Sequence, residues 1–144
     1  MSRELKFRIW DKELKDFIYT EKYKEKAVNE SDFRIGGDFS SFSFDGGRDW
    51  SEGVFQQFTG LKDKNGTEIY EGDVIEFSLK DFKQIYQVYW NQEMLRWDYA
   101  SLKDNIEDPC ACEYNLFERN FSNAKIVGNI FESPELFKEC KPIR

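Results

Sequence analysis

Two cysteines one residue apart, Cys110 and Cys112, come nearest to a reactive motif in this chain. A structural zinc site needs four ligands, usually Cys or His, arranged as a tetrahedron. The chain contains no histidine and one further cysteine, Cys140, so Asp108, Glu113 or a second subunit would have to complete the set. A nucleophilic cysteine needs a basic neighbour, whereas the charges beside Cys110 are acidic and disfavour the thiolate. The pattern therefore favours reduced structural thiols and predicts no metal site.

Carboxylates are the other abundant reactive group, and several fall close together in the stretch 63–73. Paired carboxylates serve glycoside hydrolysis and two-metal hydrolysis. Asp63, Glu68, Glu71 and Asp73 lack a partner lysine at a strand end, and without histidine the commonest general acid–base group is missing. The sequence therefore predicts no catalytic residue, no cofactor and no enzymatic activity. A metal-dependent hydrolase is the least favoured alternative.

The charge of the chain disfavours nucleic acid as a partner. The net charge is −7, and the nearest approach to a basic cluster, Lys22, Lys24 and Lys26, is interleaved with glutamates. Nonspecific nucleic-acid binding depends on clustered Lys and Arg that neutralise phosphates. An acidic surface is compatible with solubility alone or with a basic partner.

The spacing of apolar residues predicts a mainly β protein that begins with a hairpin. Leu5, Phe7 and Ile9 occupy alternate positions, as in a half-buried strand, and 16–20 reads as the returning strand. Residues 21–32 are charged and weakly patterned, and they are compatible with either a short helix or a loop.

An aromatic segment follows, in which two glycine pairs bracket Phe39, Phe42 and Phe44. Phe42 and Phe44 alternate with serine, as in a strand. These rings predict either an exposed loop that docks a partner or a strand that faces the core or another subunit. The pattern favours the second interpretation.

The central stretch predicts a small antiparallel sheet. Asn65–Gly66 and 71–73 are turn signals, and alternating strands follow at 74–79, 84–90 and 95–99. Three consecutive strands at this spacing are typical of a small SH3-like barrel-type sheet.

The aromatic residues of this sheet allow a second interpretation. Tyr86, Trp90, Trp97 and Tyr99 would serve as stacking faces if the barrel bound single-stranded nucleic acid. The shortage of basic residues favours core packing instead.

The C-terminal region predicts a closing strand and a short helix. Residues 125–131 read as the strand, with a bulge at Gly128, and Ser133 and Pro134 are typical of a helix start. We expect 1–58 to hold the hairpin and the aromatic Gly/Ser-rich segment, and 59–144 to hold the barrel-like region and the helix, as one cooperative unit.

Three motifs resemble the YopX family of phage and prophage proteins. The first spans 6–13 and reads Lys-Phe-Arg-Ile-Trp-Asp-Lys-Glu, the second spans 57–74, and the third spans 127–136. They occur in the expected order over almost the whole chain. Ile9 and Phe131 depart from the family pattern, in which Ala and Tyr are expected.

The resemblance implies a phage or prophage origin, a bacterial cytoplasm and homo-oligomerisation. The family has no agreed activity, so the resemblance assigns no functional residue. Three of its glycines, Gly60, Gly66 and Gly72, predict positions where a Cβ would strain the backbone. We therefore interpret the three family motifs as residues required by the fold rather than as residues of a functional site.

The favoured function is non-catalytic protein binding by a self-associating β scaffold, with a bacterial host protein, such as a defence enzyme, as the partner to be inhibited. The aromatic content of 17% exceeds what a small core readily hides, which favours self-association. The predicted partner-binding residues come from the aromatic segment and an acidic connector: Phe39, Phe42, Phe44, Asp104, Glu107, Asp108 and Glu113.

The sequence also predicts the compartment. The segment 1–10 is charged and amphipathic, unlike a signal peptide, and the apolar runs are too short to span a bilayer. Three cysteines do not form a secreted disulfide framework. We therefore expect a cytoplasmic protein with no membrane partner.

Overall fold

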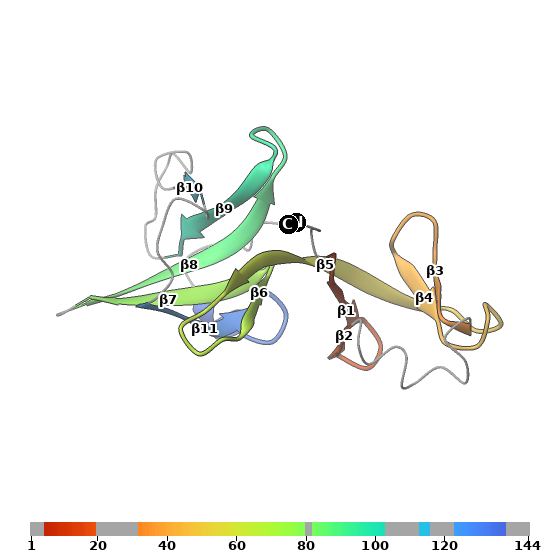
Figure 1. Cartoon of the computed structure of the whole chain (residues 1–144). Helices are drawn as coiled ribbons and strands as arrows, with labels where there is room; N and C mark the ends of the chain where they lie inside the picture. The colour runs from red at the N-terminus through yellow and green to blue at the C-terminus, as the bar shows by residue number, and fades with distance from the viewer. Residues whose placement is uncertain (1–4, 20–31, 80–81, 103–112, 116–122, 138–144) are drawn as a thin grey trace. The chain divides into compact units, whose positions relative to one another are not determined.

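Short antiparallel strands make up the computed structural model of this chain (Figure 1). The structure describes residues 5–19, 32–79, 82–102, 113–115 and 123–137. The chain divides into two compact units, Met1–Phe58 and Thr59–Arg144, and the long strand β5 (Ser51–Lys62) contributes to both. Unfolding of the two units in one cooperative step stays a prediction.

In the first unit, a hairpin and a second strand pair flank β5. β1 (Phe7–Asp11) pairs antiparallel with β2 (Asp16–Tyr19) and with β5, which confirms the predicted N-terminal hairpin. On the other side of β5 lies β4 (Ser41–Ser43), which pairs in turn with β3 (Arg34–Ile35). The strand order is therefore β2-β1-β5-β4-β3.

The core of the first unit gathers where these strands meet. Ile9 stands directly across from Ile18 on β2 and from Phe55 on β5, and Phe42 of β4 joins them. A Cβ at Gly53 of β5 would clash with Cγ2 of Ile9 and would stand 3.1 Å from Cε1 of Phe42. The missing side chain at Gly53 is what lets both residues approach the same stretch of backbone.

In the second unit, five strands form an antiparallel sheet in the order β10-β9-β8-β7-β11. Their bounds are β7 (Asp73–Leu79), β8 (Phe82–Asn91), β9 (Arg96–Ser101), β10 (Glu113–Asn115) and β11 (Ala124–Asn129). β7, β8 and β9 are the three consecutive strands that the alternation predicted. The short strand β6 (Glu68–Tyr70) pairs with β5.

The core of the second unit is rich in rings that meet edge to face. Phe77, Tyr86 and Tyr99 form a triangle in which the centroids of Tyr86 and Tyr99 lie 5.0 Å apart. The buried residues of this core are Ile69, Ile75, Phe77, Tyr86, Val88, Trp97, Tyr99 and Ala124.

Asp63 ties the turn after β5 to the distant strand β11. Its Oδ1 accepts hydrogen bonds from the backbone N–H groups of Asn65 and Thr67, both at 2.9 Å, and its Oδ2 accepts one from Ile126 at 3.1 Å. Asp73 is also buried, and its Oδ2 accepts from the N–H of Tyr70 at 2.8 Å. These two carboxylates therefore organise turns.

The glycines of the central motif have the backbone that the sequence predicted. Gly60, Gly66 and Gly72 have φ values of 91°, 79° and 82°, although Gly60 lies within β5 rather than in a turn. The N–H of Gly72 donates to the carbonyl of Val88 at 2.8 Å, and its carbonyl accepts from Ile130 at 2.9 Å. A left-handed backbone at this point lets one residue bond to two neighbouring segments.

The C-terminal region contains the predicted bulge and a shorter helix than expected. The register between β11 and β7 shifts between Ile126 and Gly128, which confirms the bulge. The helix is one four-residue 3-10 turn, η5 (Pro134–Phe137). Ser133 does not cap it in the expected way, because its Oγ accepts a hydrogen bond from Asn129, upstream of the turn, at 3.3 Å.

The mainly β class is confirmed, in the form of two antiparallel sheets. The described residues contain no α-helix of seven residues or more, and their strands do not show a closed barrel. The segment 21–31, for which a short helix or a loop was expected, lies outside the described residues.

Candidate functional site

The β8–β9 hairpin carries a group of exposed apolar side chains at its end. Trp90, Met94 and Leu95, which we call the β8–β9 tip, are 38%, 57% and 67% exposed. Soluble proteins scatter single apolar residues over their surface, but several within one turn indicate an interaction site. The tip is therefore the first candidate for a binding surface.

Strand register explains why this hairpin is left uncovered. The pairing of β7 with β8 begins at Val74 and Gln87, and the pairing of β10 with β9 stops at Asp98. The pairs Trp90–Trp97 and Asn91–Arg96 lie beyond both limits, so among the described strands no neighbour flanks them. Figure 1 shows the turn between β8 and β9 at the free end of this hairpin.

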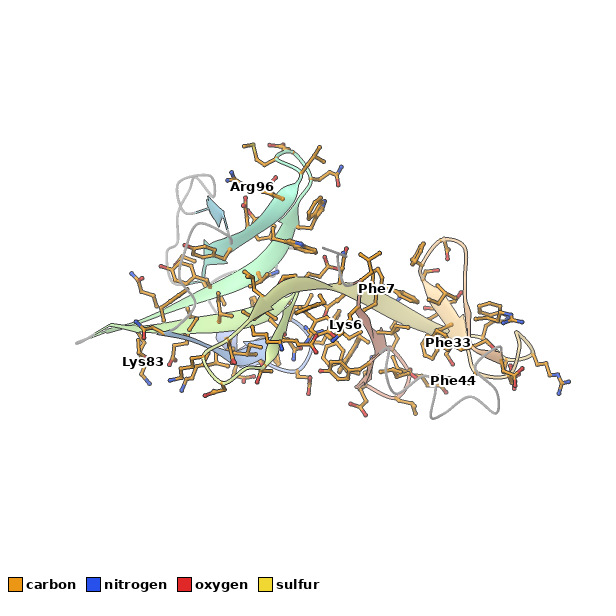
Figure 2. The ribbon with its side chains drawn as sticks, in the orientation of Figure 1. Lys6, Phe7, Phe33, Phe44, Lys83 and Arg96 are labelled. Carbon is orange, nitrogen blue, oxygen red and sulfur yellow. The ribbon has the colours of Figure 1, made fainter. Side chains whose placement is uncertain are left out.

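A polar network of the flanking strand residues fixes the turn between β8 and β9. Oδ1 of Asn91 accepts hydrogen bonds from the N–H groups of Glu93 and Met94, both at 3.1 Å. Nδ2 of Asn91 donates to Oδ2 of Asp98 at 2.7 Å, and Nε of Arg96 donates to Oδ1 of the same carboxylate at 2.7 Å. Asp98 is fully buried. The turn is therefore held by side chains of the two strands, and Figure 2 labels Arg96 at the start of β9.

Two indole rings brace the same hairpin. Trp90 and Trp97 stand opposite each other in the β8–β9 pairing and meet edge to face, with centroids 5.0 Å apart at 71°. Trp97 is buried, whereas Trp90 donates its indole N–H to Oε1 of Gln92 at 3.0 Å. An aromatic cross-strand pair stiffens a hairpin, so the tip is presented in one shape.

Leu95 has a backbone conformation that does not suit leucine. Its φ is 51°, in the left-handed region, where a Cβ crowds the following carbonyl and where Gly or Asn is normally found. Burial does not compensate, because two thirds of the residue is exposed. A bulky residue kept in a strained conformation at an exposed position points to a role for its side chain outside the fold.

Replacing Leu95 should therefore stabilise the protein. We expect Leu95→Asn to raise the free energy of unfolding by about 1 kcal/mol, because asparagine tolerates the left-handed region better. Urea unfolding followed by circular dichroism measures the change. Lys15→Asn is the matched control, since Lys15 has a φ of 55° in the other hairpin turn and should give a similar gain. A loss of stability in both variants would contradict the strain argument.

The structure separates the three phenylalanines that the sequence grouped. Phe39 is 57% exposed, with a φ of 56°, and its ring meets that of Phe55 edge to face. Phe42 is 1% exposed and lies in the core. Phe44 is half-buried beside Phe33, with centroids 5.7 Å apart, and Figure 2 labels both. A partner would reach Phe39 without rearrangement, but it would not reach Phe42.

The acidic part of the predicted site falls largely outside the described residues. This applies to Asp104, Glu107 and Asp108, and also to the thiols Cys110, Cys112 and Cys140. Glu113 lies in β10, of which the structure describes the backbone.

The loop after Phe44 is organised by Asp45. Its Oδ1 accepts from the N–H of Asp49 at 3.0 Å, from the hydroxyl of Ser43 at 2.8 Å and from the N–H of Arg48 at 2.9 Å. Trp50 follows the loop, and its indole N–H donates to the carbonyl of Gly47 at 3.0 Å.

These contacts predict a pH dependence for the loop. The hydrogen bonds from Asp49 and then Ser43 hold the pKa of Asp45 below its ordinary value. A depressed pKa means that the loop gains order above the ordinary pKa and loses it as pH falls through the lowered pKa. In an acid titration by NMR, the amide shifts of Arg48 and Asp49 should therefore move with a midpoint below that of an unfolded aspartate. A midpoint at or above that value would contradict the assignment.

Three of the four rings considered for nucleobase stacking are buried. Tyr86, Trp97 and Tyr99 are at most 5% exposed and belong to the core of the second unit, whereas Trp90 is exposed at the tip. Stacking on a base requires an exposed ring face, so three of these rings are not positioned for it.

Two further observations concern metals and membranes. Within the part of the chain that the structure describes, no group of three or more His, Cys, Asp or Glu side chains could hold a metal ion. In the same residues, no helix has the length and apolar character needed to cross a bilayer.

Sequence reasoning missed the β8–β9 tip. The sequence predicts a strand over 95–99, which places Leu95 at its first position rather than in an exposed turn. The turn in fact runs to Leu95, and β9 begins at Arg96. The available signal was the similarity to the first hairpin, in which Trp10-Asp11 precedes four turn residues as Trp90-Asn91 does here.

Comparison with known proteins places the fold and the family. A match to the crystal structure of protein EF1440 from Enterococcus faecalis covers 95% of this chain and 100% of that chain, with a TM-score of 0.52 and 24% identity. At this identity the likeness concerns the fold alone. No curated protein matches the sequence significantly. The family model described as YopX protein matches residues 6–138, which is nearly the full length. The chain therefore belongs to the YopX family.

Proposed function

We propose that this protein is a phage- or prophage-encoded accessory protein that binds other proteins without catalysis and associates with itself. Its partner is a bacterial host protein in the cytoplasm, and binding inhibits that protein, for example an enzyme of host defence. The support is a scaffold whose buried carboxylates Asp63, Asp73 and Asp98 hold turns and hairpins, while apolar side chains are displayed at its surface.

One observation carries the proposal: Leu95 is exposed and strained at the same time. A structural role would favour Gly or Asn at this position. A catalytic role would require a polar or titratable group. An aliphatic side chain displayed in solvent on a braced turn is suited to enter an apolar depression on another protein, because a preorganised backbone loses little entropy on binding.

Affinity purification from phage-infected or prophage-carrying cells tests this function. We expect the tagged protein to recover one host protein repeatedly. Met94→Asp combined with Leu95→Asp should abolish the recovery, and Leu5→Asp is the matched control because Leu5 is 62% exposed and belongs to the other unit. Circular dichroism of each variant excludes misfolding as the cause.

Other outcomes would overturn the proposal. Recovery of nuclease-sensitive nucleic acid alone would favour a single-stranded nucleic-acid-binding module. Calorimetric binding of Mg²⁺, Mn²⁺ or Zn²⁺ would favour a metal-dependent hydrolase. Recovery that is unaffected by the double substitution would remove the tip from the binding surface.

Self-association is a separate part of the proposal. It is supported by Phe39 and Trp50, which are about half exposed in the first unit. Multi-angle light scattering at micromolar concentration should give a mass above the 17.2 kDa of the chain. A monomer mass over the whole concentration range would contradict self-association.

We also propose that the sheet of the second unit belongs to the SH3-like barrel type. The support is the β7-β8-β9 meander together with the hydrogen bonds from Ile126 to Asp63 and from Lys64 to the carbonyl of Ala124, which tie the turn after β5 to β11. Amide–amide NOEs between β10 and β5 or β6 would establish closure, and a solvent-exchanging outer edge of β10 would exclude it.

A further inference from the structure

The first unit contains a hairpin whose turn matches that of the β8–β9 hairpin. In β1–β2, Oδ1 of Asp11 accepts from the N–H groups of Glu13 and Leu14, at 2.9 and 3.0 Å. In β8–β9, Oδ1 of Asn91 accepts from the residues at the same two turn positions. The last turn residue is left-handed in both, with φ values of 55° at Lys15 and 51° at Leu95.

The aromatic brace is also repeated. Trp10 stands opposite Phe17 and meets it edge to face, with centroids 4.9 Å apart at 62°. Trp90 and Trp97 do the same at 5.0 Å and 71°. Each turn is thus clamped by a side-chain cap and by a ring pair one residue further from the turn, although the two hairpins belong to different units.

Both turns present a glutamate followed by a large apolar side chain to solvent. The second turn residue is a glutamate, Glu13 or Glu93, and both are exposed. The third is an unbranched or γ-branched aliphatic residue: Leu14 is 69% exposed and Met94 is 57% exposed. The first turn also carries two cations. Lys12 has a partner, because its Nζ lies 3.3 Å from Oε2 of Glu52, and Lys15 is exposed at the last turn position, on the far side of Leu14 from Glu13.

We infer that the turns 12–15 and 92–95, here called the two tips, are two copies of one recognition element. Each inserts its third residue, Leu14 or Met94, into an apolar socket edged by basic side chains on a protein partner. The inference rests on the proposed protein-binding function and specifies its surface. The kind of partner is inferred from charge: Glu13 and Glu93, beside the apolar side chains, complement basic residues at the rim of the partner's socket. The net charge of −7 disfavours a second copy of this chain as the source of such a rim, and it would repel anionic lipid or nucleic acid.

Site-specific photo-cross-linking tests the inference in cells. p-Benzoyl-phenylalanine is placed at position 14, at position 94 and, as the control, at position 5, whose leucine is similarly exposed outside both turns. We expect positions 14 and 94 to cross-link the same protein, with a yield about tenfold above that of position 5, as for a residue central to an interface. The cross-linked peptides of the partner should carry Lys or Arg.

Charge reversal provides the second arm. Glu13→Lys should reduce the cross-link from position 14, and Glu93→Lys the cross-link from position 94, by about tenfold each, while Glu→Gln at the same sites should have a smaller effect. Unchanged cross-linking yields after charge reversal would overturn the proposal that the partner's socket has a basic rim. Different proteins at positions 14 and 94, or cross-links at one of them alone, would overturn the equivalence of the tips. If the affinity-purified partner cross-links at neither tip, the inference fails while the protein-binding function stands; if no partner is recovered at all, both fail.

Discussion

Asn91→Asp and Asp98→Asn should each destabilise the protein by about 3 kcal/mol, whereas the two changes together should restore most of the loss. In Asp98→Asn the new amide would direct an N–H group at the Nδ2 donor of Asn91, which now lies 2.7 Å from Oδ2 of Asp98. Asn91 cannot flip to accept it, because its Oδ1 already accepts from two turn amides. In Asn91→Asp two carboxylate oxygens would face each other in the same buried space.

The exchanged pair satisfies every one of these hydrogen bonds. The carboxylate at position 91 would accept from the turn and from the new amide at 98, and the oxygen of that amide would still accept from Nε of Arg96. Urea unfolding of the four proteins measures the coupling free energy, which we expect to exceed about 3 kcal/mol. Glu93→Gln, in the exposed turn, is the control for loss of a carboxylate and should be neutral. Additive losses in the double variant would show that the network does not hold the hairpin.

Gly53→Ala should destabilise the first unit by about 3 kcal/mol. The added Cβ would overlap Cγ2 of Ile9, which is fully buried between Ile18 and Phe55 and has no room to retreat. Thermal unfolding measured by near-ultraviolet circular dichroism reports the loss.

The matched control is Gly37→Ala, because a Cβ at Gly37 would meet no atom within 4 Å and its φ is not positive. It should change stability by less than about 1 kcal/mol. Ile9→Ala removes the clashing methyl and leaves a cavity, so it should cost less in the Gly53→Ala background than in the native protein. Equal costs in both backgrounds would place the damage elsewhere.

Local pattern and turn chemistry predicted most of the strands. The alternation of Leu5, Phe7 and Ile9 predicted the strand β1, but not its burial: Arg8 and Trp10 on the other face are buried as well, and Leu5 precedes the strand and is exposed. The turn predicted at Asn65–Gly66 is confirmed, because Gly66 has a positive φ. The bulge at Gly128 was predictable from a glycine within an apolar strand. A Cβ there would clash with Oγ of Ser133 and stand 2.9 Å from Cδ1 of Leu136, which the sequence does not reveal.

The C-terminal helix shows where local signals mislead. Ser133 and Pro134 are typical of a helix start, but the hydroxyl of Ser133 is used by Asn129, and Leu136 donates to the carbonyl of Ser133 in a 3-10 pattern at 3.1 Å. Asn129 also ends β11 early, because its Oδ1 accepts from the N–H groups of Phe131 and Glu132. These are competing side-chain contacts that a propensity argument does not weigh.

The candidate site was harder to predict than the fold, for a physical reason. The exposure of Met94 and Leu95 depends on where β7 and β10 stop along their neighbours, and that is set by register across the sheet. The three phenylalanines were predicted to lie in a strand that faces the core or another subunit, and Phe42 does lie in the core. Phe39 is not part of the strand: it lies before β4, has a left-handed backbone, and its ring contacts that of Phe55.

The position of Asn91 and Asp98 outside the four residues they organise has an evolutionary consequence. Residues 92–95 contribute little to the scaffold, so new tetrapeptides at this position would keep the same architecture while changing what the protein recognises. Such a segment can diversify quickly against a target that itself changes, and the same property makes it a convenient place to graft a randomised library.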